Sequence, residues 1–192
     1  FVEPRKYLIK YPRGPELDQS INNFNELIQL VNNLDIVIKS KIKFRTKGTY
    51  SYDSRKKFSE IFRKDSIEEV SNENSLEKTM LNSRLIIVTY PETSFSQAMY
   101  SNVPTILITK KEHYQFTKTA LHTFNILKKN KIAFEDFNEA KDHINKYWKE
   151  LDSWWKCKNV QSARKIFLKN FFHVKSDWCR EWSDYIHSSL FS

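Results

Sequence analysis

The stretch from Ser83 to Lys110, SRLIIVTYPETSFSQAMYSNVPTILITK, constrains the fold more than any other part of the chain. Leu85 to Val88 is a continuous apolar run, and Thr105 to Thr109 is a second run of the same kind. Such runs are typical of strands that are buried on both faces of a parallel sheet. The residues between them, Thr93 to Ser101, have the pattern of a helix. A strand, a helix and a strand in this order predict an α/β fold with a parallel sheet.

Helices and strands alternate up to about Phe134, and only helices are expected after it. We therefore interpret residues 1–134 as an α/β domain and residues 135–192 as a helical extension that packs on it. The expected strand-like segments outside the central stretch are Tyr7 to Lys10 and the extended residues 35–48. The expected helices are Ser20 to Asn33, Asp53 to Lys64, His113 to Asn130, Asn138 to Lys149, Val160 to Phe172 and Ser176 to Ser188.

Glycine is scarce, and this excludes two common classes of nucleotide-binding protein. Gly14 and Gly48 are the only glycines in the 192 residues. The chain therefore has neither the GxGxxG fingerprint of dinucleotide oxidoreductases nor the P-loop of ATPases. The formal net charge of +9 favours anionic partners such as phosphates, nucleotides, nucleic acid or a negatively charged membrane face. The alternative is that this charge only keeps the chain soluble.

The cysteines and the hydropathy indicate where the chain works. Cys157 and Cys179 form no CxxC pair and have no histidine at metal-ligand spacing, so a reducing cytoplasm is the expected location. No apolar run approaches a membrane span, and no signal-peptide pattern is present. The chain begins at Phe1 rather than Met, which we interpret as a piece of a longer protein.

Hydroxyl groups follow the first buried strand at the point where it passes into a helix. Ligands of open parallel sheets bind at the carboxyl ends of the strands, and Tyr90 to Ser94 should lie at such an end. A helix that begins at Thr93 or Ser94 offers free backbone N–H groups and the positive end of its dipole, which can hold a phosphate. The alternative is that one of these residues is simply the N-cap.

Basic residues are expected at the same edge of the sheet. Arg45 and Lys47 follow an alternating segment, and arginine is a natural bidentate partner of phosphate. The alternative is a solvated edge strand protected from aggregation by its charges. His113 follows the second buried strand and would reach this edge too, although a lone histidine is more often an ordinary residue at a helix start.

Aromatic side chains crowd the last third of the chain. Trp178, Trp182 and Ile186 recur at i, i+4 and i+8, which places them on one helical face. Mixed with basic residues, they could stack single-stranded nucleic acid. We favour a core or interdomain face, because this spacing turns the rings in the same direction, and we expect no nucleic acid partner because no known binding motif is present.

Five segments, taken together, resemble a known family. They are KFR (43–45), SRLIIVTY (83–90), TSFSQAMYSNVPT (93–105), EHYQF (112–116) and SWWKCKNVQSARKIF (153–167). In this order they resemble the transferases of bacterial surface-carbohydrate loci, first described in Leptospira, over roughly residues 24–182. Those proteins look like GT-B glycosyltransferases, which pair two Rossmann-like domains across a cleft.

The resemblance implies a Rossmann-like, three-layer fold for residues 1–134 and a glycosyltransferase function. The chain would be the C-terminal half, which binds a nucleotide-sugar donor, and the helical extension would lie toward a missing N-terminal half. Thr93 and Ser94 would sit under the donor phosphates and Gln97 would face the ribose. Arg45 and His113 would line the cleft. With Lys47 and Tyr90 added, there are seven expected binding residues.

The resemblance also implies partners and leaves rival functions open. The acceptor would be a glycan or a lipid-linked glycan, with possible peripheral contact at the inner membrane face. We expect no cofactor and no metal ion, since no Asp-x-Asp is present, and we nominate no catalytic residue. Gln97 and Gln115 stand where the family prefers acids, which keeps a non-catalytic homologue open. A GT-B-shaped nucleotide-sugar epimerase and a basic nucleic-acid-binding module stay open as well.

Overall fold

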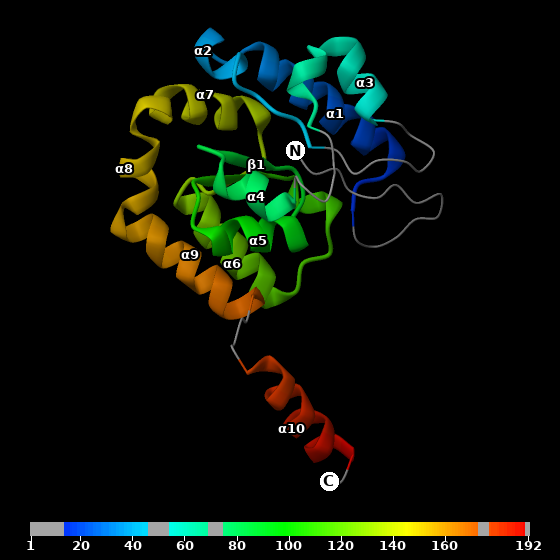
Figure 1. The fold of residues 1–192 in the computed structure, drawn as a ribbon, viewed down its shortest axis with the longest axis vertical. Helices are drawn as coiled ribbons and strands as arrows, with labels where there is room; N and C mark the ends of the chain where they lie inside the picture. Colours follow the sequence, from blue (N-terminus) through cyan, green and yellow to red (C-terminus); the bar gives the residue numbers. More distant parts are fainter. Residues whose placement is uncertain (1–13, 46–53, 69–74, 173–176, 191–192) are drawn as a thin grey trace.

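The computed structural model of the chain describes residues 14–45, 54–68, 75–172 and 177–190. Its centre is a three-stranded parallel sheet in the order β1 (Ile86–Val88), β2 (Thr105–Ile108) and β3 (Ala133–Phe134) (Figure 1). All four residues of β2 are buried, as expected for the middle strand of a parallel sheet. The parallel α/β arrangement predicted from the sequence is therefore present.

The unit predicted around Ser83 to Lys110 forms as expected. Helix α5 (Thr93–Ser101) connects β1 to β2 and contacts both strands. Its buried side chains include Phe95, Ala98 and Met99, whose helical spacing turns them toward the sheet. Strand β3 was not predicted, because a two-residue strand leaves too short a pattern to recognise.

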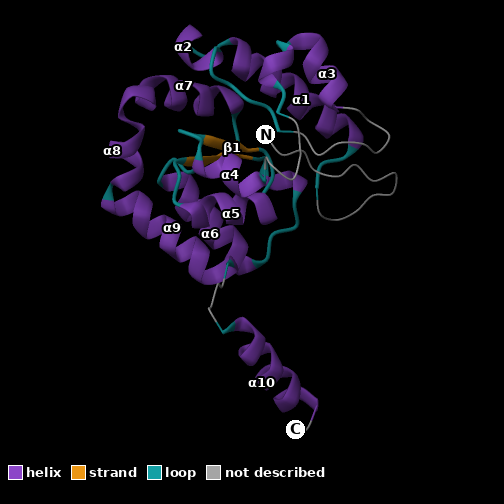
Figure 2. Ribbon diagram, in the orientation of Figure 1, coloured by secondary structure: helices purple, strands orange, loops and turns teal. Residues whose placement is uncertain are grey.

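Helices cover both faces of the sheet, as Figure 2 shows. Helix α7 packs on one face together with α1, and α5 packs on the other face, where α9 covers it. Helix α6 adjoins β3 and α9. The bounds of these helices are α1 Leu17–Asn32, α6 Lys118–Lys129, α7 Phe137–Tyr147 and α9 Lys158–Phe171.

The predicted extended segment over residues 35–48 is partly wrong. Its first part is a short helix, α2 (Ile36–Lys39), in which Ile38 enters the core while Ile36 and Val37 stay exposed. Its second part is extended as far as residue 45, and among the described residues Phe44 makes an isolated parallel bridge with Ile67. Residues 46–48 of the predicted segment lie outside the described residues. The first part is helical because the carbonyl of Asp35 accepts hydrogen bonds from the N–H groups of residues 38 and 39, which closes a helical turn.

Aromatic stacking fixes the Phe44 bridge. The ring of Phe44 stacks on Phe58 and on Phe62, each at 4.6 Å between centroids. Phe58 comes from α3 (Ser54–Ile61), which lies within the predicted helix Asp53 to Lys64. Between α3 and β1 lie the short helices η1 (Lys64–Ser66) and α4 (Leu76–Leu81).

Two further predictions change at their boundaries or fall outside the described residues. The helix expected from His113 to Asn130 begins at Lys118 as α6, because the Thr117 hydroxyl caps it by accepting the N–H of Ala120. His113 instead ends a separate short helix, η2 (Lys111–His113). The predicted strand Tyr7 to Lys10 lies outside the described residues.

The aromatic tail divides into a buried and an exposed part. Trp154 and Trp155, from α8 (Leu151–Lys156), and Phe167 are buried, as expected for core residues. Helix α10 (Trp178–Leu190) projects away from the rest of the chain (Figure 1). Its apolar face, which we expected to pack, is open, since Trp178 and Trp182 are each 60% exposed. The remaining short helix is η3 (Trp148–Glu150).

Candidate functional site

An open hollow of about 620 Å³ lies beyond the carboxyl ends of β1 and β2. We call it the strand-end hollow. Its lining comes from the start of α5, from the segment after β2 and from the end of α9. The lining residues are Pro91, Glu92, Thr93, Ser96, Tyr114, Gln115, Phe116, Thr117, Ala120, Phe171 and Phe172. Its position follows from the topology, because the loops after parallel strands meet at one edge of the sheet.

Thr93 and Ser94 point to different surroundings. Thr93 is exposed and lines the strand-end hollow. Ser94 is only 7% exposed, and its Oγ lies 3.3 Å from the Oη of Tyr90, which is also buried. Burial raises the pKa of Tyr90, so its phenol remains neutral at physiological pH. The expected hydroxyl pair is therefore split, with Thr93 available to a ligand and Ser94 bound to Tyr90.

The N-terminus of α5 presents backbone N–H donors and one acidic side chain to the hollow. The N-cap is Glu92, whose side chain makes no capping bond. The first hydrogen bond within the helix joins the N–H of Ser96 to the carbonyl of Glu92. The amides of residues 93–95 therefore have no acceptor within the helix. These amides and the helix dipole favour an anion, whereas the exposed Glu92 carboxylate opposes one.

The part of the hollow that follows β2 is aromatic. Tyr114 stacks on Phe116 with 5.9 Å between ring centroids, and Phe116 stacks on Phe124 of α6. Burial raises the pKa of Tyr114 to about 12, against a hydrogen bond with Thr109 that lowers it. Aromatic side chains that line a hollow, as Tyr114 and Phe116 do, can support a planar ring of a ligand.

The two glutamines of interest lie in different places. Gln115 lines the strand-end hollow beside Tyr114. Gln97 is exposed on α5 but is not among the residues that line this hollow. The structure therefore brings Thr93 and Gln115 together, and leaves Gln97 outside.

His113 is a buried residue that contacts α1. It is 7% exposed, and its Nδ1 lies 3.3 Å from the side-chain nitrogen of Asn23. Burial lowers its pKa, so the neutral ring is favoured. Beside it, the Nζ of Lys110 lies 2.9 Å from a carboxylate oxygen of Glu26, which ties the end of β2 to the same helix. His113 thus holds α1 in place and does not line the strand-end hollow.

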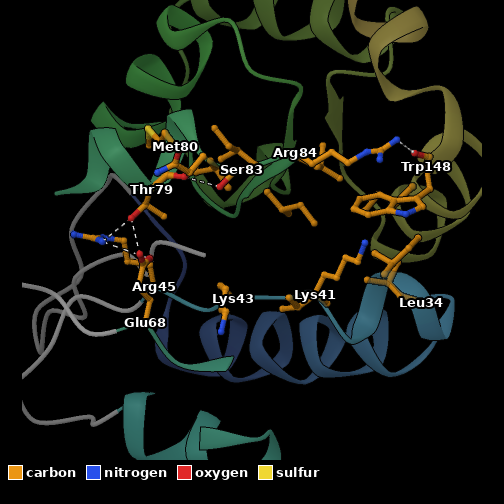
Figure 3. A pocket seen from close by; sticks show the side chains of 18 of the residues that line it. Leu34, Lys41, Lys43, Arg45, Glu68, Thr79, Met80, Ser83, Arg84 and Trp148 are labelled. Carbon is orange, nitrogen blue, oxygen red and sulfur yellow. Dashed lines mark hydrogen bonds and ion pairs between the residues drawn. The ribbon is translucent and has the colours of Figure 1, made fainter. Parts of the chain in front are cut away.

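Arg45 lies in a second hollow, shown in Figure 3. Its Nη1 donates to the hydroxyl of Thr79 at 3.0 Å and lies 3.4 Å from the carboxylate of Glu68. The Arg45 side chain is only 12% exposed. The expected opposition of Arg45 to Thr93 is not seen, since Arg45 lines this second hollow and Thr93 lines the strand-end hollow. Lys47 lies outside the described residues.

The motif residues of the tail hold helix α5. The indole of Trp155 and the side chain of Gln161 both donate to the side-chain oxygen of Asn102, which follows α5 in a left-handed conformation with φ 58°. The guanidinium of Arg164 donates to the carbonyls of Met99 and Tyr100 at 2.6 and 3.0 Å. The tail segment 153–167 carried part of the family resemblance, but the sequence gave it no structural role. Its cluster of donor side chains was the signal that could have indicated one.

Metal clusters and membrane-spanning helices are both absent from the described residues. Among residues 14–45, 54–68, 75–172 and 177–190, no group of three or more His, Cys, Asp or Glu side chains could hold a metal ion. In the same part of the chain, no helix has both the length and the apolar character required to cross a bilayer. Cys157 and Cys179 are free and exposed.

The fold and the strand-end hollow define an α/β protein with a ligand-sized opening at the carboxyl edge of a parallel sheet. The family model described as LIC12162 family transferase matches residues 2–186. The chain therefore belongs to this transferase family. Neither the curated proteins nor the solved structures contain a significant match to it.

Proposed function

We propose that this chain is the nucleotide-sugar donor-binding part of a glycosyltransferase that works in surface-polysaccharide assembly. The observation that carries the proposal is the strand-end hollow, which joins the N-terminus of α5 to an aromatic wall after β2. The membership of a transferase family supports a group-transfer reaction. The formal net charge of the chain, +9, favours an anionic substrate.

The parts of a nucleotide sugar match the parts of the hollow. The amides of residues 93–95 and the Thr93 hydroxyl can donate to phosphate oxygens, as helix N-termini do in other proteins. The Tyr114 and Phe116 rings offer a surface on which a nucleobase can stack. Gln115 can donate and accept hydrogen bonds to a sugar hydroxyl.

The chemistry assigned to this part of the protein is positioning and stabilisation of the leaving nucleotide. We infer that the acceptor is a glycan or a lipid-linked glycan, that the reaction takes place in the cytoplasm, and that the rest of the catalytic machinery lies outside residues 1–192. The volume of about 620 Å³ falls in the usual range of small-molecule sites.

Thermal unfolding with a panel of nucleoside mono- and diphosphates tests this function. A ligand at a hundred times its Kd stabilises the folded chain by about 2.7 kcal/mol. We expect one base to stabilise the chain more than the others, and we expect Thr93→Asp, which adds a negative charge to the hollow, to remove the effect. Equal unfolding temperatures with every nucleotide would contradict the proposal.

One observation favours a second candidate. Gln115 lines the hollow at a position where the resembled transferases prefer an acid, so the chain could bind a donor without turnover. Transfer activity that appears only in Gln115→Glu, with nucleotide binding equal in both forms, would identify a non-catalytic homologue.

A further inference from the structure

The second hollow, in which Arg45 lies, has a volume of about 400 Å³ and lies beside β1 (Figure 3). Its lining comes from α2, from residues 41–45, from α4 and β1, and from single residues of α7 and η3. Most of the described lining side chains are apolar, among them Ile38, Met80 and Ile87. The second hollow shares no described lining residue with the strand-end hollow, so the two lie at separate places in the molecule.

The apolar lining has a buried part and a partly exposed part. Val88 and Ile144 are fully buried, and Met80 is nearly so. Ile86 and Ile87 of β1 remain partly exposed, whereas every residue of β2 is buried. Covering such partly exposed aliphatic groups with another apolar group is favourable. The second hollow is therefore suited to the hydrocarbon part of a ligand.

The second hollow also carries an excess of positive charge. Four basic side chains line it, and Glu68 is the one acid among the described residues that do so. Glu68 pairs with Arg45, with 3.4 Å between a carboxylate oxygen and Nη1. Lys43 donates to the backbone carbonyl of Asp65. The excess charge therefore comes mainly from the other two basic side chains.

These two side chains, Lys41 and Arg84, lie at the Trp148 end of the second hollow (Figure 3). Arg84 donates through Nη2 to the carbonyl of Trp148 at 2.8 Å, and its guanidinium carbon lies 5.0 Å from the centroid of the Trp148 ring. In the described part of the chain, neither cation has a carboxylate partner. Both residues are exposed, so they can meet an anionic group that stays near solvent.

We propose that the second hollow binds a hydrocarbon chain that carries a phosphate group, with the chain against β1 and the phosphate at Lys41 and Arg84. This inference rests on the lipid-linked acceptor of the proposed function, and it gives the lipid phosphate of that acceptor a binding site. Arginine and lysine both bind phosphate oxygens through charge-assisted hydrogen bonds. A free phosphate would leave the aliphatic lining uncovered, and a neutral chain would leave the two cations without an anion.

Exposed side chains of α2 support a membrane lipid as the source of this chain. Ile36 is 77% exposed and Val37 is 55% exposed, while Ile38 of the same helix lines the second hollow. Exposed apolar side chains that lie together mark surfaces for protein or membrane contact. A bilayer against Ile36 and Val37 places its lipid phosphates close to Lys41, which follows α2 in the chain.

Titration calorimetry with butyl, hexyl, octyl and decyl phosphate, each below its micelle concentration, tests the hydrocarbon part. Each added methylene should tighten binding about fourfold until the apolar lining is covered. Decanol, which lacks the anion, should bind at least about tenfold more weakly than decyl phosphate. Affinity that does not depend on chain length, or no binding by any of the four phosphates, would overturn the proposal.

The variant Lys41→Glu tests the position of the phosphate. It should weaken decyl phosphate binding by about tenfold or more and leave decanol binding unchanged. The matched control Lys129→Glu makes the same change of charge at an exposed residue of α6 that lines neither hollow, and it should keep the native affinity. Equal losses in the two variants would contradict the assignment, because they would show a response to net charge alone.

Sedimentation with vesicles tests the lipid source and separates this inference from the proposed function. Phosphatidylcholine vesicles that contain hexadecyl phosphate should bind the chain more tightly than vesicles given the same charge by phosphatidylserine. Nucleoside diphosphates should not release the chain, because the strand-end hollow is separate. Alkyl phosphate binding without nucleotide binding would support this inference and refute the donor site. Nucleotide binding without alkyl phosphate binding, or equal sedimentation with both kinds of vesicle, would overturn this inference alone.

Discussion

The indole N–H of Trp155 donates to two oxygens of Asn102, at 2.9 Å to the backbone carbonyl and at 3.1 Å to the side-chain Oδ1. Asn102 ends α5 and adopts φ 58°, in the left-handed region. The buried ring of Trp155 thus fixes the turn between α5 and β2. Since α5 begins at the strand-end hollow, this contact helps to set the position of Thr93.

Substitution of Asn102 separates the two contributions of this turn. Asn102→Ala should lower the free energy of unfolding by about 2 kcal/mol, because alanine disfavours the left-handed region and lacks the Oδ1 acceptor. Asn102→Gly should cost less, about 1 kcal/mol, because glycine adopts positive φ without strain. Urea unfolding measures both. Equal losses for the two variants would mean that backbone strain contributes nothing here.

Arg164 should stabilise the end of α5 through its planar fork. Its two donations to the carbonyls of Met99 and Tyr100 satisfy groups that a helix C-terminus leaves without partners. Lysine cannot reproduce the fork, so Arg164→Lys should lower the free energy of unfolding by about 1–2 kcal/mol. The control Lys165→Ala, at an exposed neighbour, should stay within about 0.5 kcal/mol of the native value. Equal effects of the two changes would contradict this role.

His143 should make stability fall in mild acid. It is buried against Trp154 and Tyr147, and burial lowers its pKa to about 4. In the unfolded chain this histidine binds a proton near pH 6.5, whereas in the folded chain it does so only near pH 4. The contribution of neutral His143 to the free energy of unfolding is therefore fully present above pH 6.5 and is lost as the pH falls toward 4. The loss is about 3 kcal/mol at most.

The variant His143→Phe isolates this contribution. Phenylalanine does not titrate, and it removes the buried Nε2, which has no hydrogen-bond partner among the described residues. The difference in unfolding free energy between the variant and the native chain should therefore grow as the pH falls from 6.5 to 4. Because His113 and Glu135, whose pKa values are also lowered, are present in both proteins, their effects cancel. Parallel stability curves would contradict the assignment.

Loss of the Thr93 hydroxyl should affect nucleotide binding, whereas loss of the Ser94 hydroxyl should affect stability. Thr93→Ala removes a hydroxyl that lines the strand-end hollow, so we expect it to weaken nucleotide binding by roughly fivefold to tenfold with little change in stability. Ser94→Ala removes the buried partner of Tyr90 and should cost about 1 kcal/mol of stability, with binding nearly unchanged. Isothermal titration and urea unfolding measure the two effects. A reversal of the two effects would place the ligand elsewhere.

The central fold could be predicted from the sequence because its signals are local. The apolar runs that became β1 and β2, and the helix from Thr93 to Ser101, each carry their own periodicity. The short strand β3 and the helical turn α2 depend on tertiary packing. Residues 133 and 134, for instance, pair with Leu107 and Ile108 of β2, far away in the sequence.

The candidate site could be predicted only in part. Its location followed from a rule about parallel sheets, and Thr93 lies there. The surroundings of Arg45 and His113 depend on contacts with Glu68 and Asn23, which no pattern around either residue reveals. The role of the tail motif depended in the same way on the distant Asn102.

Photolabelling tests the central claim most directly. The chain is irradiated with azido-nucleoside diphosphates, one for each base, and the labelled peptides are identified by mass spectrometry, with unlabelled nucleotide as competitor. The account predicts competed labelling within residues 91–96 or 114–120, on the two sides of the strand-end hollow. Competed labelling confined to residues 41–45 beside Arg45, or none with any base, would contradict it.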